Sequence, residues 1–260
     1  ACLAFACPVH AERVKMTNNH WTFSKSDVRQ TLNLSLFKVI NDFTAQALGV
    51  PHVAANELVE VQPGKSQAHA TRLVIGPGTG LGVAGVFPGQ RAWIPLPTEG
   101  GHVTFAPTDE TERAIVDVFK QRRTRISVER ILCGQGILEL YQAYCSFEGT
   151  EPRFTRPAEV TLAANEGDPL ATAALLRFLK ILGDVCGDAT LTMGARGGVY
   201  LCGGILPRLL DWLPKSELCA AFSNKGRMGT YNTDIPIWVV TAPWTGLLGA
   251  AEALHNEEVF

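Results

Sequence analysis

The stretch TRLVIGPGTGLGVAGVF, residues 71 to 87, joins two apolar runs through a turn rich in glycine. The runs predict two strands, and the turn GPGTGLG (76–82) predicts that they form a hairpin. Strand residues follow the turn and no lysine stands behind it, so it matches neither a Walker A loop nor a dinucleotide-binding fingerprint. Its backbone N–H groups can crowd around a phosphate, with a hydroxyl from Thr79. A tight hairpin that needs only small residues would give the same pattern.

Outward from this hairpin, strands and helices follow one another in mixed order, which predicts an α/β or α+β fold. Strands are expected at 2–9 (buried and ending at Pro8), 36–42, 91–96, 197–206 and 235–240, with a turn around Asn18 and Asn19. Helices are expected to begin at Ser24 or Ser26 and to cover 43–50, 127–144, 168–191 and 245–256. In the longest helix, Asp168 is the expected N-cap and Pro169 the first residue, with Arg177, Lys180, Asp184 and Asp188 outside its apolar face.

Composition excludes several classes of protein. The chain has 260 residues, is 46% hydrophobic and carries a formal net charge of -2, which fits a globular protein with a full core. Its one basic run, KQRRTR (120–125), is typical of a solvated helix end and predicts no nucleic-acid or membrane surface. Seven scattered cysteines argue against a disulfide framework and a zinc site, and favour a reducing cytoplasm. The sequence contains no apolar run of the roughly 20 residues that span a membrane.

The segment VINDFTA (39–45) is a candidate catalytic site. An apolar strand that ends in Asn41 and Asp42 delivers a carboxylate to the edge of a sheet where α/β proteins bind ligands. Asp42 could act there as a general base that takes a proton from a hydroxyl group. The alternative is that Asp42 only caps the helix that follows.

The loop LPTEGGHVTF (96–105) places Glu99 and His102 on either side of two glycines, where the backbone can approach a ligand closely. Taken singly, His102 reads as a structural histidine, Glu99 as a surface acid, and Glu129 in SVERILCG (127–134) as a residue that favours the helix dipole. Together with Asp42 and the glycine turn, they fit a kinase that binds a polyhydroxylated substrate.

Six segments carry a resemblance to a known family: MTNNHWTFS (16–24), VINDFTA, GPGTGLGVA, LPTEGGHVTFAP, SVERILCG and GGVYLCGGILPR (197–208). In this order and approximate spacing they resemble the bacterial ATP-dependent glucokinases, within the hexokinase, actin and Hsp70 superfamily. The resemblance covers nearly the whole chain. It favours the glucokinase branch over the sugar kinases with a cysteine-rich zinc site, because VTFAPTDET follows His102 without a cysteine.

The resemblance implies a two-domain, actin-like (ribonuclease H-like) α/β fold with a cleft between the domains. Residues 1–52 and 243–260 would form the smaller domain, and 53–242 the larger. It implies glucose and Mg-ATP as ligands, phosphorylation of the 6-hydroxyl at the entry to glycolysis, a cytoplasmic homodimer, and no metal ligand of the chain's own. Asp42 would be the catalytic base, and the glucose ligands would be Asn41, Glu99, His102 and Glu129. The nucleotide would lie against Gly76, Gly78, Thr79, Gly80, Gly82, Gly203 and Gly204.

The chain departs from the family pattern in two places. The family begins with a DxGGT-type motif that handles the β- and γ-phosphates and the metal, and these 260 residues contain none. The first three strands and a helix of the smaller domain are therefore expected to be absent. Thr98 stands where the family has glycine, and a β-branched residue restricts the loop.

The missing motif leaves an alternative function open. The chain could be a non-catalytic remnant that binds sugar or assembles with another chain through an exposed sheet edge. A glycosidase with Glu99 and Glu129 as its acid and base would also fit by residue type. That alternative leaves Asn41, Asp42 and both glycine segments unexplained.

Overall fold

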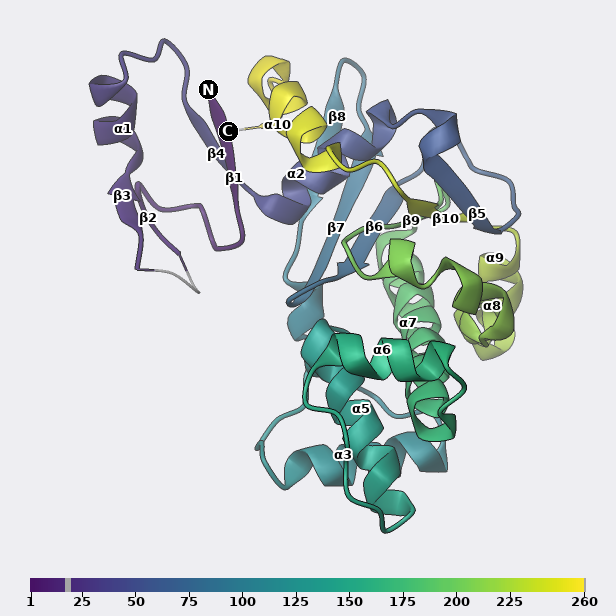
Figure 1. Cartoon of the computed structure of the whole chain (residues 1–260). Helices are drawn as coiled ribbons and strands as arrows, with labels where there is room; N and C mark the ends of the chain where they lie inside the picture. Colours follow the sequence, from purple (N-terminus) through teal and green to yellow (C-terminus); the bar gives the residue numbers. More distant parts are fainter. Residues whose placement is uncertain (17–19, 260) are drawn as a thin grey trace.

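The computed structural model describes residues 1–16 and 20–259, so the turn expected at Asn18 and Asn19 lies outside the described residues. Its centre is a mixed six-stranded sheet in the order β5-β10-β9-β6-β7-β8 (Figure 1). The strands are β5 (Leu58–Gln62), β6 (Arg72–Pro77), β7 (Leu81–Pro88), β8 (Trp93–Pro97), β9 (Val199–Leu201) and β10 (Ile237–Val240). Strands β6, β9 and β10 run parallel, whereas β5, β7 and β8 pair antiparallel with their neighbours. The predicted hairpin is confirmed, with Gly76 directly opposite Gly82.

Helices cover both faces of this sheet because its inner strands carry apolar side chains on both faces. On β6, Leu73 and Ile75 belong to the larger core, whereas Val74 belongs to the smaller core on the other face. The larger core packs beneath α3 (Glu110–Lys120), α5 (Gly134–Phe147), α6 (Pro157–Asn165), α7 (Pro169–Met193) and α8 (Leu218–Ser223), with α9 (Gly229–Thr233) beside α8. The smaller core lies under α2 (Asp42–Gly49) and α10 (Thr245–His255), which pack against each other (Figure 1).

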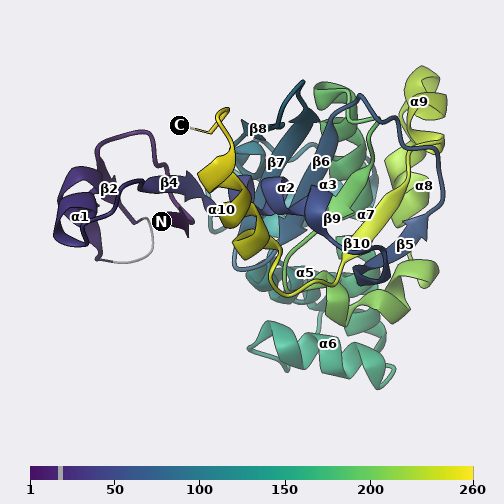
Figure 2. The same ribbon diagram turned by 90° about the horizontal axis from the view of Figure 1, so that it is seen from above.

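The N-terminal segment stands to one side of the sheet and has its own small core around Cys7, Val14 and Val39 (Figure 2). It contains β1 (Cys2–Phe5), β2 (Arg13–Lys15), β3 (Thr22–Ser24), α1 (Lys25–Thr31) and β4 (Lys38–Asn41). Strand β1 pairs in parallel with β4, and β2 pairs with β3. Of the two expected caps for α1, Ser24 is the one that accepts the amide hydrogen bond.

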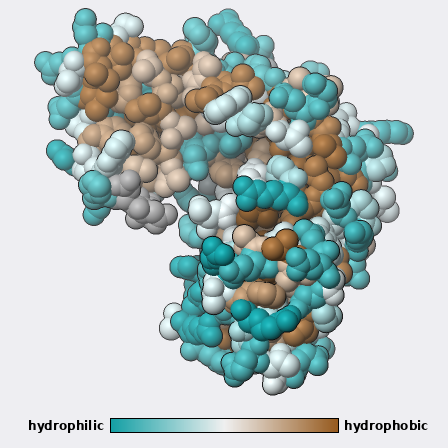
Figure 3. Space-filling view, in the orientation of Figure 1, coloured by the Kyte–Doolittle hydropathy of each residue, from teal (hydrophilic) through white to brown (hydrophobic). Residues whose placement is uncertain are grey.

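The prediction of a buried strand at 2–9 is wrong in length and in burial. The strand ends at Phe5, and Leu3 is 40% exposed. Among the described residues β1 pairs with β4 on one edge and with no strand on the other, so a single neighbour covers it. Figure 3 shows apolar surface over this segment and a hollow between it and the helices below.

The single helix predicted over 127–144 is also wrong. The structure has α4 (Val128–Ile131), a break at Leu132 and Cys133, and then α5. Cys133 is extended (φ -147°, ψ 174°), and its Sγ accepts a hydrogen bond from the Gly136 amide, which starts a second helix. A Cβ on Gly136 would lie 1.9 Å from the Ile131 carbonyl oxygen, so the two helices meet too closely for a larger residue.

Helix α7 begins at the predicted cap, Asp168, and ends at Gly194, which has a left-handed backbone. Its supposedly outer charges are mostly enclosed. Arg177 and Lys180 contact the fully buried carboxylate of Glu112, and Asp184 is buried against Lys180 and Lys225. The helical pattern missed this because α3, which carries Glu112, was not predicted and packs over that side.

Two findings concern the chain as a whole. Of the described helices, none has both the length and the apolar character that crossing a bilayer requires. All seven cysteines are free thiols.

Candidate functional site

Three backbone turns meet at one edge of the central sheet. Strands β6 and β9 are parallel neighbours, so the turns that follow them, 78–80 and 202–204, emerge side by side. A Cβ on Gly203 would lie 2.7 Å from the carbonyl oxygen of Pro77, and the Gly203 backbone has φ +90°. The third turn arrives from the start of α5, where the Gly134 amide donates a hydrogen bond of 2.8 Å to the Gly78 carbonyl oxygen.

The glycines predicted to contact a phosphate have different surroundings. Gly78 and Gly204 face open space, with no atom within 4 Å of the point where a Cβ would stand, and Thr79 beside them is exposed. Gly82 instead lies beneath the ring of Phe43, and Gly76 lies against both the Cys202 carbonyl oxygen and the same ring. Open backbone at Gly78 and Gly204 is what a phosphate or a nucleoside needs in order to approach closely.

The structure brings Glu99, His102 and Glu129 together, although Glu129 comes from a different segment. Glu99 precedes the short 3-10 turn η3 (Gly100–His102), and Glu129 lies in the first turn of α4. The imidazole Nε2 is 3.8 Å from Glu99 Oε2, and Nδ1 is 3.7 Å from Glu129 Oε1. Both distances exceed an ordinary hydrogen bond, so the imidazole lies near both carboxylates without hydrogen-bonding to either. Glu99 and His102 are largely exposed.

Glu129 is the most enclosed of the three, with a side chain that is 25% exposed. Its Oε2 accepts a hydrogen bond of 3.1 Å from the Leu81 amide, at the end of the glycine turn. A Cβ on Gly80 would lie 2.4 Å from the same oxygen. The glycine turn and the cluster of Glu99, His102 and Glu129 are therefore in direct contact through Glu129.

Asn41 and Asp42 stand where β4 passes into α2. The alternative that Asp42 merely caps this helix is wrong, because Asn41 is the cap: its Oδ1 accepts hydrogen bonds from the amides of Phe43 and Thr44. Asp42 is half-buried in the first turn. Burial raises the pKa of its carboxyl group above the ordinary value, against hydrogen bonds from the Phe43 amide and the Asn41 side chain. A raised pKa makes the carboxylate a better proton acceptor.

Two residues near this cluster have roles that the sequence did not reveal. Arg125 was expected on a solvated helix end, but its Nη2 donates to the His102 carbonyl oxygen at 2.6 Å and to Thr104 Oγ1 at 3.2 Å. The sequence feature that could have revealed this role is the position of Arg125 just before SVER. The 126–128 segment runs antiparallel to the 103–105 segment and exchanges backbone hydrogen bonds with it. Thr98, instead of merely restricting the loop, donates to the Val83 carbonyl oxygen at 2.7 Å and accepts from the Gly100 amide.

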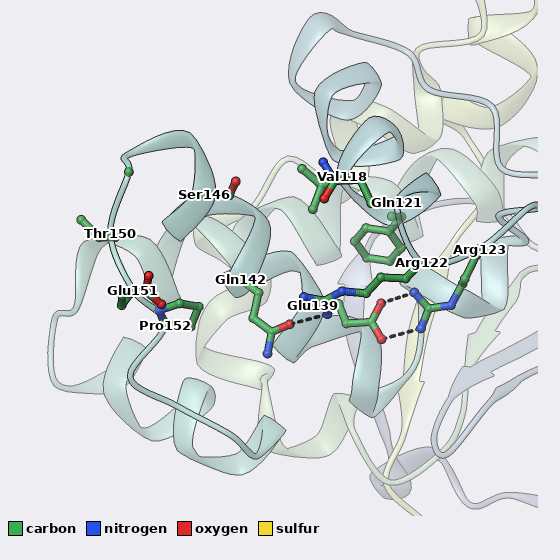
Figure 4. A pocket seen from close by; sticks show the side chains of 12 residues that line it. Val118, Gln121, Arg122, Arg123, Glu139, Gln142, Ser146, Thr150, Glu151 and Pro152 are labelled. Carbon is green, nitrogen blue, oxygen red and sulfur yellow. Dashed lines mark hydrogen bonds and ion pairs between the residues drawn. The ribbon is translucent and has the colours of Figure 1, made fainter.

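A separate cavity of about 390 Å³ lies between the end of α3, α5 and the 149–152 loop (Figure 4). Its wall includes the ion pair of Arg123 and Glu139, with contacts of 2.6 and 2.7 Å, and none of the predicted site residues. Within residues 1–16 and 20–259, no group of three His, Cys, Asp or Glu side chains could hold a metal ion.

Comparison with known proteins identifies the family. A family model described as Glucokinase matches residues 1–257. The glucokinase of Chromohalobacter salexigens is 66% identical over 259 residues, which cover 100% of this chain and 81% of that protein. The glucokinase of Hahella chejuensis is 54% identical over 260 residues, again 100% and 81%.

A solved structure agrees with these sequence matches. The crystal structure of a glucokinase from an Antarctic psychrotroph superposes with a TM-score of 0.90 at 35% identity, over 98% of this chain and 80% of that one. The expected actin-like α/β fold class is thereby confirmed, and the glycosidase alternative is left without support. The residues from 1 to 257 match as one unit, and this chain therefore belongs to the glucokinase family of sugar kinases.

Proposed function

We propose that this chain transfers the γ-phosphoryl group of ATP to the 6-hydroxyl of D-glucose. The observation that carries the proposal is the contact between the Glu99–His102–Glu129 cluster and the open glycine turn at 78–80, in a chain of the glucokinase family. One site offers hydrogen bonds to a polyol, and the adjoining site offers bare backbone to a phosphate chain.

Sugar binding is assigned to Asn41, Glu99, His102 and Glu129. Carboxylates accept hydrogen bonds from hydroxyl groups, and an imidazole can accept or donate. Each hydroxyl that leaves water unpaired costs about 1–3 kcal/mol, so this set favours a ligand with several adjacent hydroxyls. Asn41 has its Oδ1 committed to the helix cap, and its amide NH2 group, which also bonds to Asp42, has a second N–H to donate.

Asp42 is assigned the role of general base. Its carboxylate takes the proton of the 6-hydroxyl as the sugar oxygen forms a bond to the γ-phosphorus. The bond from that phosphorus to the β–γ bridging oxygen breaks, and ADP leaves with the electron pair. The raised pKa of Asp42 supports this role.

The nucleotide is assigned to Gly78, Thr79 and Gly204, where the backbone is open, together with the neighbouring Gly76, Gly80, Gly82 and Gly203 that shape the two turns. Magnesium ions bind to substrate phosphates and usually to only one or two protein carboxylates. We therefore infer that the phosphates of ATP would hold Mg²⁺, which would supply positive charge next to the transferred group.

The wider expectations remain proposals. They are a smaller domain of 1–52 plus 243–260, a larger domain of 53–242 with a cleft between them, a cytoplasmic homodimer, and a place at the entry to glycolysis. The hollow visible in Figure 3 supports a cleft.

A second candidate function is a sugar-binding remnant without kinase activity. The decisive experiment measures ATP-dependent formation of glucose 6-phosphate by this chain, with Asp42→Asn prepared in parallel. Turnover that disappears in the variant supports the kinase. A folded chain that binds glucose and gives no product supports the remnant.

A further inference from the structure

Gly80 lies in the turn assigned to the nucleotide, but its nearest neighbour is a sugar ligand. A Cβ at this position would lie 2.4 Å from Glu129 Oε2 and 3.2 Å from Glu129 Cδ. The Gly80 backbone is outside the left-handed region, so it would accept an alanine. The glycine is needed at this position because a carboxylate occupies the space, and backbone freedom is not the reason.

The next residue holds the same carboxylate. The Leu81 amide donates to Glu129 Oε2 at 3.1 Å, while Oε1 faces His102 Nδ1 at 3.7 Å. Gly80 and Leu81 thus position the Glu129 carboxylate together. Gly80 leaves space for the carboxylate, and the Leu81 amide donates a hydrogen bond to it. Oε2 is fixed by this contact, whereas Oε1 faces His102 Nδ1.

We infer that Gly80 and the Leu81 amide are positioning residues for sugar binding, which act through Glu129. This rests on the proposed function. The glycine turn accordingly serves two ligands, with Gly78 exposed to the nucleotide and Gly80 reserved for the carboxylate that meets glucose.

The consequence of adding a methyl group follows from these distances. To reach an ordinary contact of about 3.4 Å, Glu129 Oε2 must move by about 1 Å. This movement breaks its hydrogen bond with the Leu81 amide. The carboxylate is the far end of a flexible side chain, so the fold tolerates this movement. Losing one hydrogen bond to a charged group corresponds to about a tenfold to hundredfold loss of affinity.

Isothermal titration calorimetry with D-glucose alone, in the absence of any nucleotide, tests the inference on the full chain, comparing wild type, Gly80→Ala and Gly78→Ala. The last is a matched control, because it adds the same methyl group to the same turn where no atom lies within 4 Å. Gly80→Ala is expected to raise the Kd for glucose by tenfold or more, and Gly78→Ala to leave it within twofold. Equal glucose affinity in Gly80→Ala and wild type, or equal losses in both variants, would overturn the inference.

A second set of variants separates the role through Glu129 from a general disturbance. In a Glu129→Ala background the carboxylate is gone, so adding Gly80→Ala should change the Kd for glucose by less than twofold. If Gly80→Ala alone does not fold, Glu129→Ala should restore folding of the pair, and an unfolded pair would overturn the inference. A folded wild-type chain that binds no glucose would refute the proposed function itself, a result distinct from an insensitive Gly80→Ala.

Discussion

The ring of Phe43 occupies the space that a side chain at residue 82 would need. A Cβ on Gly82 would fall 1.8 Å from Phe43 Cδ2, and a Cβ on Gly76 would fall 2.9 Å from Phe43 Cζ. Gly76 and Gly82 face each other across the hairpin and form a flat floor for the ring. Because Phe43 follows Asp42 directly, this contact fixes the first turn of α2 against the glycine turn.

Gly82→Ala should therefore lower both the free energy of unfolding and kcat. Overpacking of this kind costs about 1–3 kcal/mol, and displacement of the Phe43 ring would shift Asp42 as well. Guanidinium unfolding and kcat are the measurements. In the Phe43→Ala background the added methyl group has room, so most of the loss in unfolding free energy should vanish there. Equal losses in both backgrounds would show that the ring is not the obstacle.

Asp42→Asn should abolish most turnover and leave glucose binding nearly intact. The amide cannot take up the proton of the 6-hydroxyl, and removal of a general base lowers kcat about 10²–10⁴-fold. Steady-state kinetics and glucose calorimetry on the same preparation check both halves. Asp27→Asn, at an exposed position on α1, is the control and should keep wild-type kcat. A variant at position 42 with a near wild-type rate would reject the assignment.

The raised pKa of Asp42 gives a pH dependence of known sign. The base form is lost as the pH falls through the raised value, so the acidic limb of kcat/KM should lie above the ordinary aspartate pKa of about 3.9. For stability, the folded state binds this proton more tightly than the unfolded state does. Relative to Asp42→Asn, the wild type should therefore lose stability as the pH rises between the unfolded and the folded pKa, and then level off. A gain over that window would contradict the assigned direction.

Glu112→Ala should be among the most damaging changes to stability. The Glu112 carboxylate is fully buried, contacts Arg177 and Lys180 at 3.1 and 2.6 Å, and accepts from the Thr108 amide at 2.7 Å. Its removal takes the fully buried carboxylate away from both cations, which keep as acidic partners only the more exposed Asp109 and, for Lys180, Asp184. Breaking a buried ion pair in this way costs about 3–5 kcal/mol. Urea unfolding measures the loss. Glu110→Ala, in the same first turn and exposed, should stay within about 0.5 kcal/mol, and a comparable loss there would point to α3 as a whole.

An alanine substitution should reduce stability at Gly203 and leave it unchanged at the adjacent Gly204. Gly203 has a left-handed backbone and no room beside the Pro77 carbonyl oxygen, so Gly203→Ala should lose about 1–3 kcal/mol of stability. Gly204 has open space around it, so Gly204→Ala should unfold like the wild type. If Gly204 faces the nucleotide, its variant should bind the ATP analogue AMPPNP more weakly in calorimetry. Unchanged AMPPNP affinity would remove Gly204 from the proposed nucleotide site.

Local patterns predicted much of the fold. The hairpin of β6 and β7, the start of α1 at Ser24 and the start of α7 at Asp168 are each set by residues within a few positions of one another. The chemistry of a turn or a cap is therefore readable from a short window. The membership of Asp42, Glu99, His102 and Glu129 in one functional set came from the family resemblance.

Elements failed to be predicted where a distant segment decides them. The break between α4 and α5 is a local exception, because Cys133 caps a new helix within an otherwise helical pattern. The charged side of α7 reads as solvated because its partner Glu112 lies on α3, more than 60 residues earlier in the chain. Arg125 reads as part of a basic run until the 103–105 segment lies beside it.

The sequence by itself determined the family, the order of most strands and helices, and which residues are candidates for acids, bases and ligands. Only the tertiary structure decided what surrounds each of these glycines of the 76–82 turn: open space at Gly78, the Cys202 carbonyl oxygen and the Phe43 ring at Gly76, the same ring at Gly82, and the Glu129 carboxylate at Gly80. Leu81 and Glu129 are 48 residues apart. Periodicity and propensity depend on residues that are close along the chain. What fills the space beside a glycine depends instead on which distant side chain the fold packs there.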